Sequence, residues 1–242
     1  MSKKTILIRV AVDQTFGKWN SPCNSVNQDF VYVPIPESYE VNQNMRKSYK
    51  DYIKPALDVF SNSNNCDVKL PDNLQNDKMH LDPDFDYLTY GDSNVRGKKL
   101  LDFKEDDIVI FYAGLQPIDG SQLVYALIGM YVVDDIKQVK NIKKGGFDKN
   151  AHTRYKKADG TDVVVTGKKG KSGRFKKYIP VGEWRNNAYR VKKDILDEWG
   201  GLGIKDGFLQ RSANPPLFLN PEKFLKWLDK QNPTTIDGNN LL

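Results

Sequence analysis

Runs of apolar residues at several places along the chain predict the strands of a sheet. The stretch KTILIRVAV, residues 4–12, predicts a buried first strand that ends at Asp13. The stretches FKEDDIVIFYAGL and QLVYALIGMYVVDDI, residues 103–115 and 122–136, are rich in β-branched and aromatic residues and flank the turn sequence QPIDGS. These two stretches predict a central hairpin.

Two shorter segments predict further strands. FVYVPIP, residues 30–36, contains two prolines, which favour an edge position because proline cannot donate a hydrogen bond to a neighbouring strand. RYKKADGTDVVVTG, residues 154–167, predicts a second hairpin around the tight turn Asp159-Gly160.

Helical spacing of apolar residues predicts three helices. In residues 42–60, Asn42 is the expected cap, Pro55 an expected kink, and the inward positions are Met45, Tyr49, Tyr52, Ile53, Leu57 and Phe60. The segment 186–201 predicts a short helix through Val191, Ile195 and Trp199 that ends at Gly200-Gly201. The segment 220–233 predicts another, with Asn220 as cap, Pro221 in the first turn, and Phe224, Leu225 and Leu228 facing inward.

The order of these elements places strands in the middle of the chain and helices outside them. We therefore predict an α+β fold with a mainly antiparallel, barrel-like central sheet and flanking helices. The whole chain, residues 1–242, is expected to form one domain with a basic arm at about residues 137–180. Because no apolar run is long enough to span a membrane and MSKKTILIRVAV lacks a cleavage site, we expect a cytoplasmic protein with no membrane partner.

The two cysteines, Cys23 and Cys66, show no paired-ligand spacing, which argues against a zinc ribbon and a disulfide scaffold. The distribution of charge indicates more about possible partners than the cysteines do. The chain has 37 Lys and Arg against 31 Asp and Glu, a formal charge of +6, and the excess is concentrated in residues 137–177. Such an excess favours a partner with a polyphosphate backbone.

The densest basic segment is TGKKGKSGRFKKY, residues 166–178, which predicts a mobile loop or hairpin tip. Such a segment attracts a nucleic acid, expected here to be DNA, and nearby aromatic residues can stack on bases. The alternative is a solvated, lysine-rich loop. The predicted backbone contacts are Lys168, Lys169, Lys171, Arg174, Lys176 and Lys177, and the interleaved aromatic residues are Tyr155, Phe175 and Tyr178.

The acidic stretch MHLDPDFDYLTYGD, residues 79–92, has little hydrophobic periodicity. One interpretation is a turn-rich loop whose aspartates cap backbone N–H groups. In a second interpretation, Asp82 and Asp84, together with Asp13, hold a hard cation such as Mg²⁺ beside substrate phosphate oxygens. His80 is then a general base or an outer metal partner, and Arg96 binds phosphate through its planar fork.

The same residues also suit base excision. A carboxylate of Asp13 or Asp82 would stabilise positive charge on the sugar, and Trp19, Phe111 or Tyr112 would stack on the extruded base. Spacing alone does not choose between the two chemistries, or between either chemistry and a structural loop.

Four motifs taken together resemble a known family, nucleotide modification associated domain 3. They are RVAVDQTFGKWNSP, YVPIPE, HLDPDFD and DDIVIFYAGL…ALIGMYVV, and they span about residues 9–133. In this resemblance the family aspartate falls on Asp13, and the acidic motif falls on His80, Asp82, Pro83 and Asp84.

The remaining family positions also have counterparts. Ser-Pro falls on residues 21–22, Pro-Ile-Pro on residues 34–36, and the strand motif on Asp107, Phe111 and Tyr112. The chain departs from the family pattern at the first loop, where paired glycines are reduced to Gly17, and at Asp106-Asp107, where Gly-Asp is usual. The backbone path of the first loop is therefore open at this point.

The family is linked to gene neighbourhoods that make or police modified DNA bases. The resemblance therefore implies a protein of a DNA-modification or anti-phage system that binds or processes a modified nucleotide. The central strands also resemble the core of PUA and EVE domains, which suggests a non-catalytic reader of modified bases as an alternative. A metal-dependent enzyme on free nucleotides is a third interpretation, and the sequence leaves open whether the protein is an enzyme.

Overall fold

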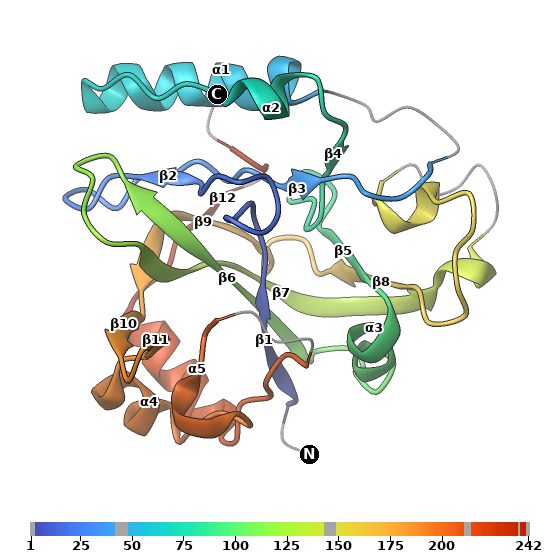
Figure 1. The fold of residues 1–242 in the computed structure, drawn as a ribbon. Helices are drawn as coiled ribbons and strands as arrows, with labels where there is room; N and C mark the ends of the chain where they lie inside the picture. Colours follow the sequence, from blue (N-terminus) through green and yellow to red (C-terminus); the bar gives the residue numbers. More distant parts are fainter. Residues whose placement is uncertain (1–2, 42–47, 143–148, 211–213, 237, 241–242) are drawn as a thin grey trace.

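The computed structural model describes residues 3–41, 48–142, 149–210, 214–236 and 238–240. Most of its strands join one sheet, which runs through the middle of the molecule (Figure 1). The main path of this sheet has the order β1 (Thr5–Arg9), β6 (Ile108–Pro117), β7 (Val124–Gln138), β8 (Val163–Gly167) and β5 (Thr89–Asp92). Strands off this path are β2 (Pro22–Cys23) on β6, β9 (Gly173–Pro180) on β7, and β12 (Thr235–Ile236) on β9.

The predicted central hairpin is confirmed. β6 and β7 pair antiparallel, with Ile108 opposite Val132 and Leu115 opposite Val124. The predicted first strand is also present as β1, which pairs parallel with β6. β1 and β5, the two ends of the main path, are not paired with each other within the described residues. The α+β class is confirmed, whereas the expected closure of the sheet into a barrel is not found.

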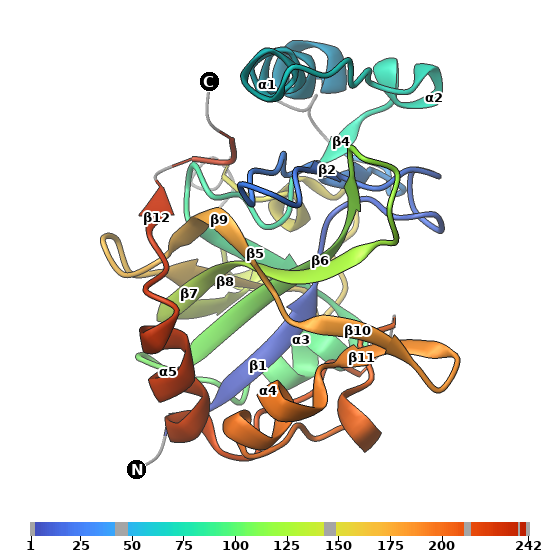
Figure 2. The same ribbon diagram turned by 90° about the vertical axis from the view of Figure 1, so that its left-hand side faces the viewer.

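The sheet separates two hydrophobic cores because successive residues of its central strands face opposite sides. In β1, Ile6 and Ile8 contribute to one core and Leu7 to the other. Both faces are therefore buried, which explains why the central strands appear as continuous apolar runs. In Figure 2, α1 (Tyr49–Asn64) and α2 (Asp72–Gln75) lie on one side of the sheet. On the other side lie α4 (Lys193–Trp199), α5 (Pro221–Lys230) and the hairpin of β10 (Gly182–Arg185) and β11 (Ala188–Val191).

The three predicted helices are present with changed boundaries. Helix α1 is capped by Ser48, whose side chain accepts a hydrogen bond from the backbone N–H of Asp51; the expected Asn42 cap and Met45 lie outside the described residues. Helix α5 begins after Asn220 with its predicted cap. The prediction for residues 186–201 was partly wrong, because Val191 ends β11 and the helix starts only at Lys193.

The basic segment, residues 166–178, was predicted as a mobile loop or hairpin tip, but most of it lies in two strands. β8 and β9 pair in succession with β7, Val133 lying opposite Gly167 and Met130 opposite Gly173. Residues 168–172 are therefore a short excursion between two strands of the sheet. The predicted hairpin at Asp159-Gly160 is also absent, because this turn connects the 3₁₀ helix η2 (His152–Arg154) to β8.

The remaining elements are short. β3 (Ile35–Pro36) and β4 (Met79–His80) form a separate antiparallel pair with Ile35 opposite His80, so the predicted strand at residues 30–36 is shorter than expected. Other short elements are α3 (Asn94–Leu100), η1 (Val139–Asn141) and η3 (Lys205–Gly207). None of the helices in the described ranges has the length and apolar character needed to cross a membrane.

Candidate functional site

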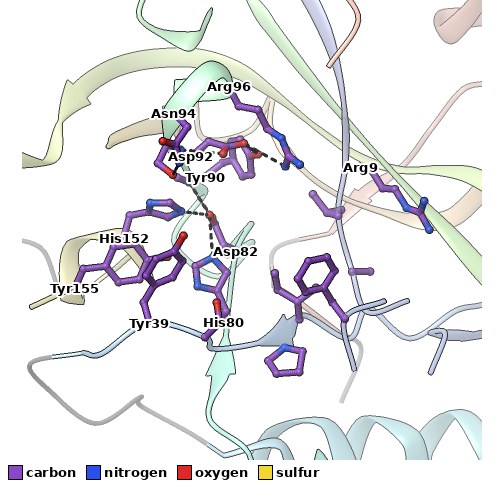
Figure 3. A pocket seen from close by; sticks show the side chains of 18 of the residues that line it. Arg9, Tyr39, His80, Asp82, Tyr90, Asp92, Asn94, Arg96, His152 and Tyr155 are labelled. Atoms are coloured by element: carbon purple, nitrogen blue, oxygen red, sulfur yellow. Dashed lines mark hydrogen bonds and ion pairs between the residues drawn. The ribbon is translucent and has the colours of Figure 1, made fainter. Parts of the chain in front are cut away.

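A cavity of about 370 Å³ opens beside the end of β1 that leads to Asp13. Segments from five parts of the chain line it, as Figure 3 shows for their side chains. They are residues 9–16 after β1, residues 35–39 around β3, the β4 segment with His80 and Asp82, residues 90–96 from β5 into α3, and the η2 region with His152 and Tyr155. Side chains with chemistry therefore converge from distant parts of the sequence.

Asp82 lies in the cavity wall between the two histidines of the chain. Its Oδ2 atom is 3.8 Å from Nε2 of His80 and 3.5 Å from Nε2 of His152. The three side chains are 3%, 10% and 7% exposed, respectively, so they meet in a region with little solvent. The imidazole rings themselves are 5.4 Å apart between centroids.

Each histidine also contacts a second carboxylate through its other ring nitrogen, Nδ1. Nδ1 of His80 is 2.9 Å from Oε2 of Glu37, and Nδ1 of His152 is 3.0 Å from Oδ1 of Asp162. Because an ionised carboxylate can only accept a hydrogen bond, Nδ1 is the donor in both contacts. In a neutral ring this leaves an unshared electron pair on each Nε2 atom, and these are the two nitrogens that lie within 4 Å of Asp82.

The cluster shifts the proton affinities of its members. Burial raises the pKa of Asp82 to about 7, against the opposing influence of both histidines and of the Gly91 N–H. Burial acts to lower the pKa of His152, but Asp162 and Asp82 outweigh it, so this pKa is raised. Burial acts to raise the pKa of Glu37, but the hydrogen bond and charge of His80, together with the Tyr39 N–H and His152, outweigh it, so this pKa is lowered. Perturbation of this kind is typical of functional sites.

Backbone geometry around Gly91 and Asn150 holds the cluster in place. The backbone N–H of Gly91 donates to both Asp82 oxygens, at 2.9 and 3.0 Å. The Asn150 side chain donates to Oδ1 of Asp82 and accepts from the backbone N–H of His152. A Cβ atom on Gly91 would lie 2.4 Å from Cδ2 of His152, so only glycine permits this close approach.

The wall formed by β5 and α3 is charged. Arg96 extends toward Asp92 with 3.7 Å between Nη1 and Oδ2, a long separation for an ion pair. The hydroxyl of Tyr90 donates to the same carboxylate. Asp13, on the opposite segment, accepts from the backbone N–H groups of Thr15 and Phe16 and pairs with Arg9 at 3.2 Å.

Two tyrosines form the remaining wall. The rings of Tyr39 and Tyr155 are 4.8 Å apart, and Tyr155 in turn lies 4.9 Å from the His152 ring and 6.2 Å from the His80 ring. Tyr155 is buried, whereas Tyr39 is 58% exposed. An exposed aromatic ring next to a polar cluster can stack against a flat ligand.

A comparison with protein-family models identifies one match. The model of nucleotide modification associated domain 3 matches residues 4–198, which includes every residue of the cavity. The chain belongs to this family. Searches of the curated proteins and of the solved structures found no match. Family membership confirms the resemblance inferred from the four motifs and associates the chain with nucleotide modification.

Three family-motif residues predicted to form the site do line the cavity, namely Asp13, His80 and Asp82, as does the predicted Arg96. Asp84 does not. It is fully buried, and its Oδ1 atom accepts hydrogen bonds from the Asn239 side chain and the Asp86 backbone N–H. The structure therefore does not bring together the predicted Mg²⁺ pair of Asp82 and Asp84.

The predicted stacking residues are not at the cavity surface. Phe111 is fully buried among aromatic rings such as Phe85 and Tyr131, and the Tyr112 hydroxyl donates to the Leu209 carbonyl oxygen in the opposite core. Their assignment as base-stacking residues is corrected, because β6 is covered on both faces. Trp19 packs against the core beneath the first loop and is not among the cavity residues.

The predicted nucleic-acid contacts need a similar correction. Arg174 is 1% exposed, lies 3.9 Å from the Phe30 ring, and donates to the carbonyl oxygens of Phe30 and Phe175, so it is not a surface residue. Phe175 and Tyr178 are buried too. Lys168 pairs with Glu105 and Asp106, and Lys177 with Asp29. Lys169, Lys171 and Lys176 are exposed, and their contact with nucleic acid remains a prediction.

The residues that complete the cluster were not predicted from the sequence. They are Glu37, Tyr39, Asp92, His152 and Asp162. One signal was available: the chain has only two histidines. Because His80 was already a candidate, His152 could have been tested as its partner, but it stood in a segment interpreted only by its positive charge.

Proposed function

We propose that the protein binds a nucleotide in this cavity and performs a chemical step on it at His80, Asp82 and His152. The observation that supports this proposal most strongly is the shared position of the two histidines, which face one carboxylate at the wall of an open cavity. A site that only recognised a base would need hydrogen-bonding groups but not two imidazoles each fixed by its own carboxylate. Family membership supports the choice of a nucleotide as ligand.

The walls provide a binding surface for each part of a nucleotide. A cavity of about 370 Å³ falls in the usual range for small-molecule sites. Tyr39 is exposed at the wall and offers a stacking face for the base. Arg96 lines the cavity beside Asp92 and Tyr90, and its contact with Asp92 is long, so its planar donors can reach a phosphate group.

The nucleotide is presented either free or within a nucleic acid, and DNA is the polymer that we propose. The exposed lysines Lys169 and Lys171 lie beside Lys168, which pairs with acidic residues just before β6. Lys168 therefore lies at one end of the β1–β6 pair, and Arg9 lies at the other end. A DNA strand held there would therefore need to extend along the sheet to reach the cavity. The role proposed for the whole protein is in a system that makes or removes modified bases.

The proposal is tested by measuring both binding and product formation. The protein is titrated with nucleosides, nucleoside monophosphates and short single-stranded and duplex DNA, modified and unmodified, and each mixture is then analysed by mass spectrometry. We expect a nucleotide to bind and to be converted. The variant Arg96→Gln should weaken binding of phosphorylated ligands at least tenfold and leave nucleoside binding unchanged, because only the phosphate contact is removed.

A matched control is Arg185→Gln. Arg185 of β10 pairs with Glu183 of the same strand and with Asp206 of η3. None of the three lines the cavity, and the variant should bind and react as the wild type does. Binding without any product would instead identify a reader of modified bases. Absence of binding by every ligand would contradict the proposal.

A further inference from the structure

When Asp82 is ionised and both rings are neutral, the atoms that face each other in the cluster are all electron-pair donors. Nδ1 of each histidine donates to its carboxylate, Glu37 or Asp162, so each neutral ring presents the unshared pair of Nε2 to the Asp82 carboxylate. In that protonation state three negatively charged carboxylates and two lone pairs lie close together in a region with little solvent. Glu37, Asp82 and Asp162 are 1%, 3% and 4% exposed. A cation between Asp82 and the two rings would remove the repulsion between these groups.

The distances also leave room for a cation. The Nε2 atoms lie 3.8 and 3.5 Å from Oδ2 of Asp82, which is longer than a direct hydrogen bond. Ligand atoms that each lie roughly 2.0–2.1 Å from a tetrahedral metal ion are about 3.4 Å apart. In the part of the chain that the structure describes, these three residues are the one group of histidine, cysteine and carboxylate ligands with such spacing, and their ligand atoms all lie within 4.8 Å of one another.

The surroundings have the features of a metal centre. Histidine ligands of metals usually donate their other ring N–H to a carboxylate or a carbonyl, which fixes the ring orientation, and Glu37 and Asp162 do this here. The backbone N–H of Gly91 and the Asn150 side chain hold the Asp82 carboxylate in the same way. Both histidines of the chain take part, although β4 and η2 are far apart in sequence.

We propose that His80, Asp82 and His152 bind one divalent transition-metal ion, with Glu37 and Asp162 orienting the two imidazoles. Two nitrogens and one carboxylate suit Zn²⁺, Fe²⁺, Co²⁺ or Mn²⁺, whereas Mg²⁺ and Ca²⁺ prefer oxygen ligands alone. Three protein ligands would leave at least one coordination position for another ligand, and all three residues line the cavity.

The ligand on which the ion would act is the nucleotide of the proposed function, and in this respect the inference rests on that proposal. A nucleotide phosphate in the cavity would lie near three carboxylates, those of Asp13, Asp82 and Asp92. A divalent ion at Asp82 would supply positive charge for an anionic ligand and a Lewis acid for the chemical step. The metal site itself does not depend on the identity of the nucleotide.

The test is a Zn²⁺ titration without nucleotide. Tag-free protein is treated with EDTA, exchanged into metal-free buffer, and titrated by calorimetry; no affinity tag is present, so His80 and His152 are the chain's only histidines. We expect one Zn²⁺ per chain, with affinity reduced at least tenfold in His80→Gln and in Asp82→Asn. Asp206→Asn removes a surface carboxylate outside the cavity and should bind Zn²⁺ as the wild type does.

Two further measurements separate metal binding from a structural effect. Co²⁺ should develop visible absorption bands of nitrogen ligation in the wild type, and these bands should be lost in His80→Gln while its circular dichroism stays that of the wild type. Glu37→Gln keeps the length of the side chain and should lower Zn²⁺ affinity about 10- to 100-fold, because the His80 ring is no longer oriented by a charged acceptor.

Failure of this inference differs from failure of the proposed function. Absence of Zn²⁺ and Co²⁺ binding to the wild type, or wild-type affinity in both His80→Gln and Asp82→Asn, would overturn the metal site. Nucleotide binding is measured separately in EDTA. Zn²⁺ binding without any nucleotide binding would support the metal site and contradict the proposed function.

Discussion

Replacing Asp82 with asparagine should stabilise the metal-free protein at pH 8. Burial raises the pKa of Asp82 from 3.8 to about 7. One pKa unit corresponds to about 1.4 kcal/mol, so the ionised carboxylate costs the folded state on the order of 4 kcal/mol. Asparagine keeps an oxygen for the Gly91 N–H and offers an amide N–H to the histidine Nε2 atoms. Because the amide is itself buried, we expect a net gain of about 1–2 kcal/mol.

The sign of this effect depends on pH. Between pH 3.8 and about 7 the unfolded chain has lost the Asp82 proton while the folded chain keeps it, so folding stability falls as pH rises through this window. Above about pH 7 the cost is complete and constant. The advantage of Asp82→Asn should therefore be full at pH 8 and smaller at pH 5 by on the order of 3 kcal/mol.

Urea unfolding in EDTA at pH 5 and pH 8 measures the prediction. The control is Asp206→Asn. The Arg185 hydrogen bond lowers the pKa of Asp206, whereas burial raises the pKa of Asp82. The control variant should therefore gain no stability at pH 8. An Asp82→Asn variant that is less stable than the wild type at pH 8, or whose advantage is the same at both pH values, would refute this account of the cluster.

Three other substitutions or treatments give separate tests. Gly91→Ala should lower stability by about 1–3 kcal/mol and weaken Zn²⁺ binding, because the added methyl group displaces His152, whereas Gly160→Ala meets no atom within 4 Å and should do neither. Asn239→Ala should destabilise the protein by about 1–3 kcal/mol in thermal unfolding without changing Zn²⁺ affinity. Burial raises the pKa of Cys23 to about 12, so a thiol reagent at pH 8 should label Cys66 alone until the chain is unfolded, and fast native labelling of both would contradict this.

The elements that the sequence predicted well are those determined by neighbouring residues. The β6–β7 hairpin follows from two apolar strands and the turn between them, and α5 follows from a cap, a first-turn proline and a periodic apolar face. The parallel pairing of β1 with β6 joins segments about a hundred residues apart, and no local pattern specifies it. Charge also misled the prediction, because Arg174 is buried against Phe30 although it lies in a basic segment.

The site was predicted only in part, because sequence motifs indicate some of its residues while packing positions the others. Asp13, His80, Asp82 and Arg96 were accessible through motifs and residue chemistry, and all four line the cavity. The separation of Asp82 from Asp84 depends on packing instead: Asn239, near the end of the chain, binds the Asp84 carboxylate, whereas Gly91 and Asn150 bind that of Asp82. His152 reaches the cluster because η2 packs against β8, which places its ring beside Gly91 of β5.

The most direct test of the central claim is an NMR titration of the two histidines with a nucleotide. Selective ¹⁵N labelling of histidine gives signals from His80 and His152 alone, so each ring can be followed without overlap. The account predicts that the nucleotide shown to bind shifts both sets of imidazole signals along one binding curve, and that the same ligand shifts them in Arg185→Gln. Binding of that nucleotide with both sets unchanged would place its site elsewhere and contradict the account.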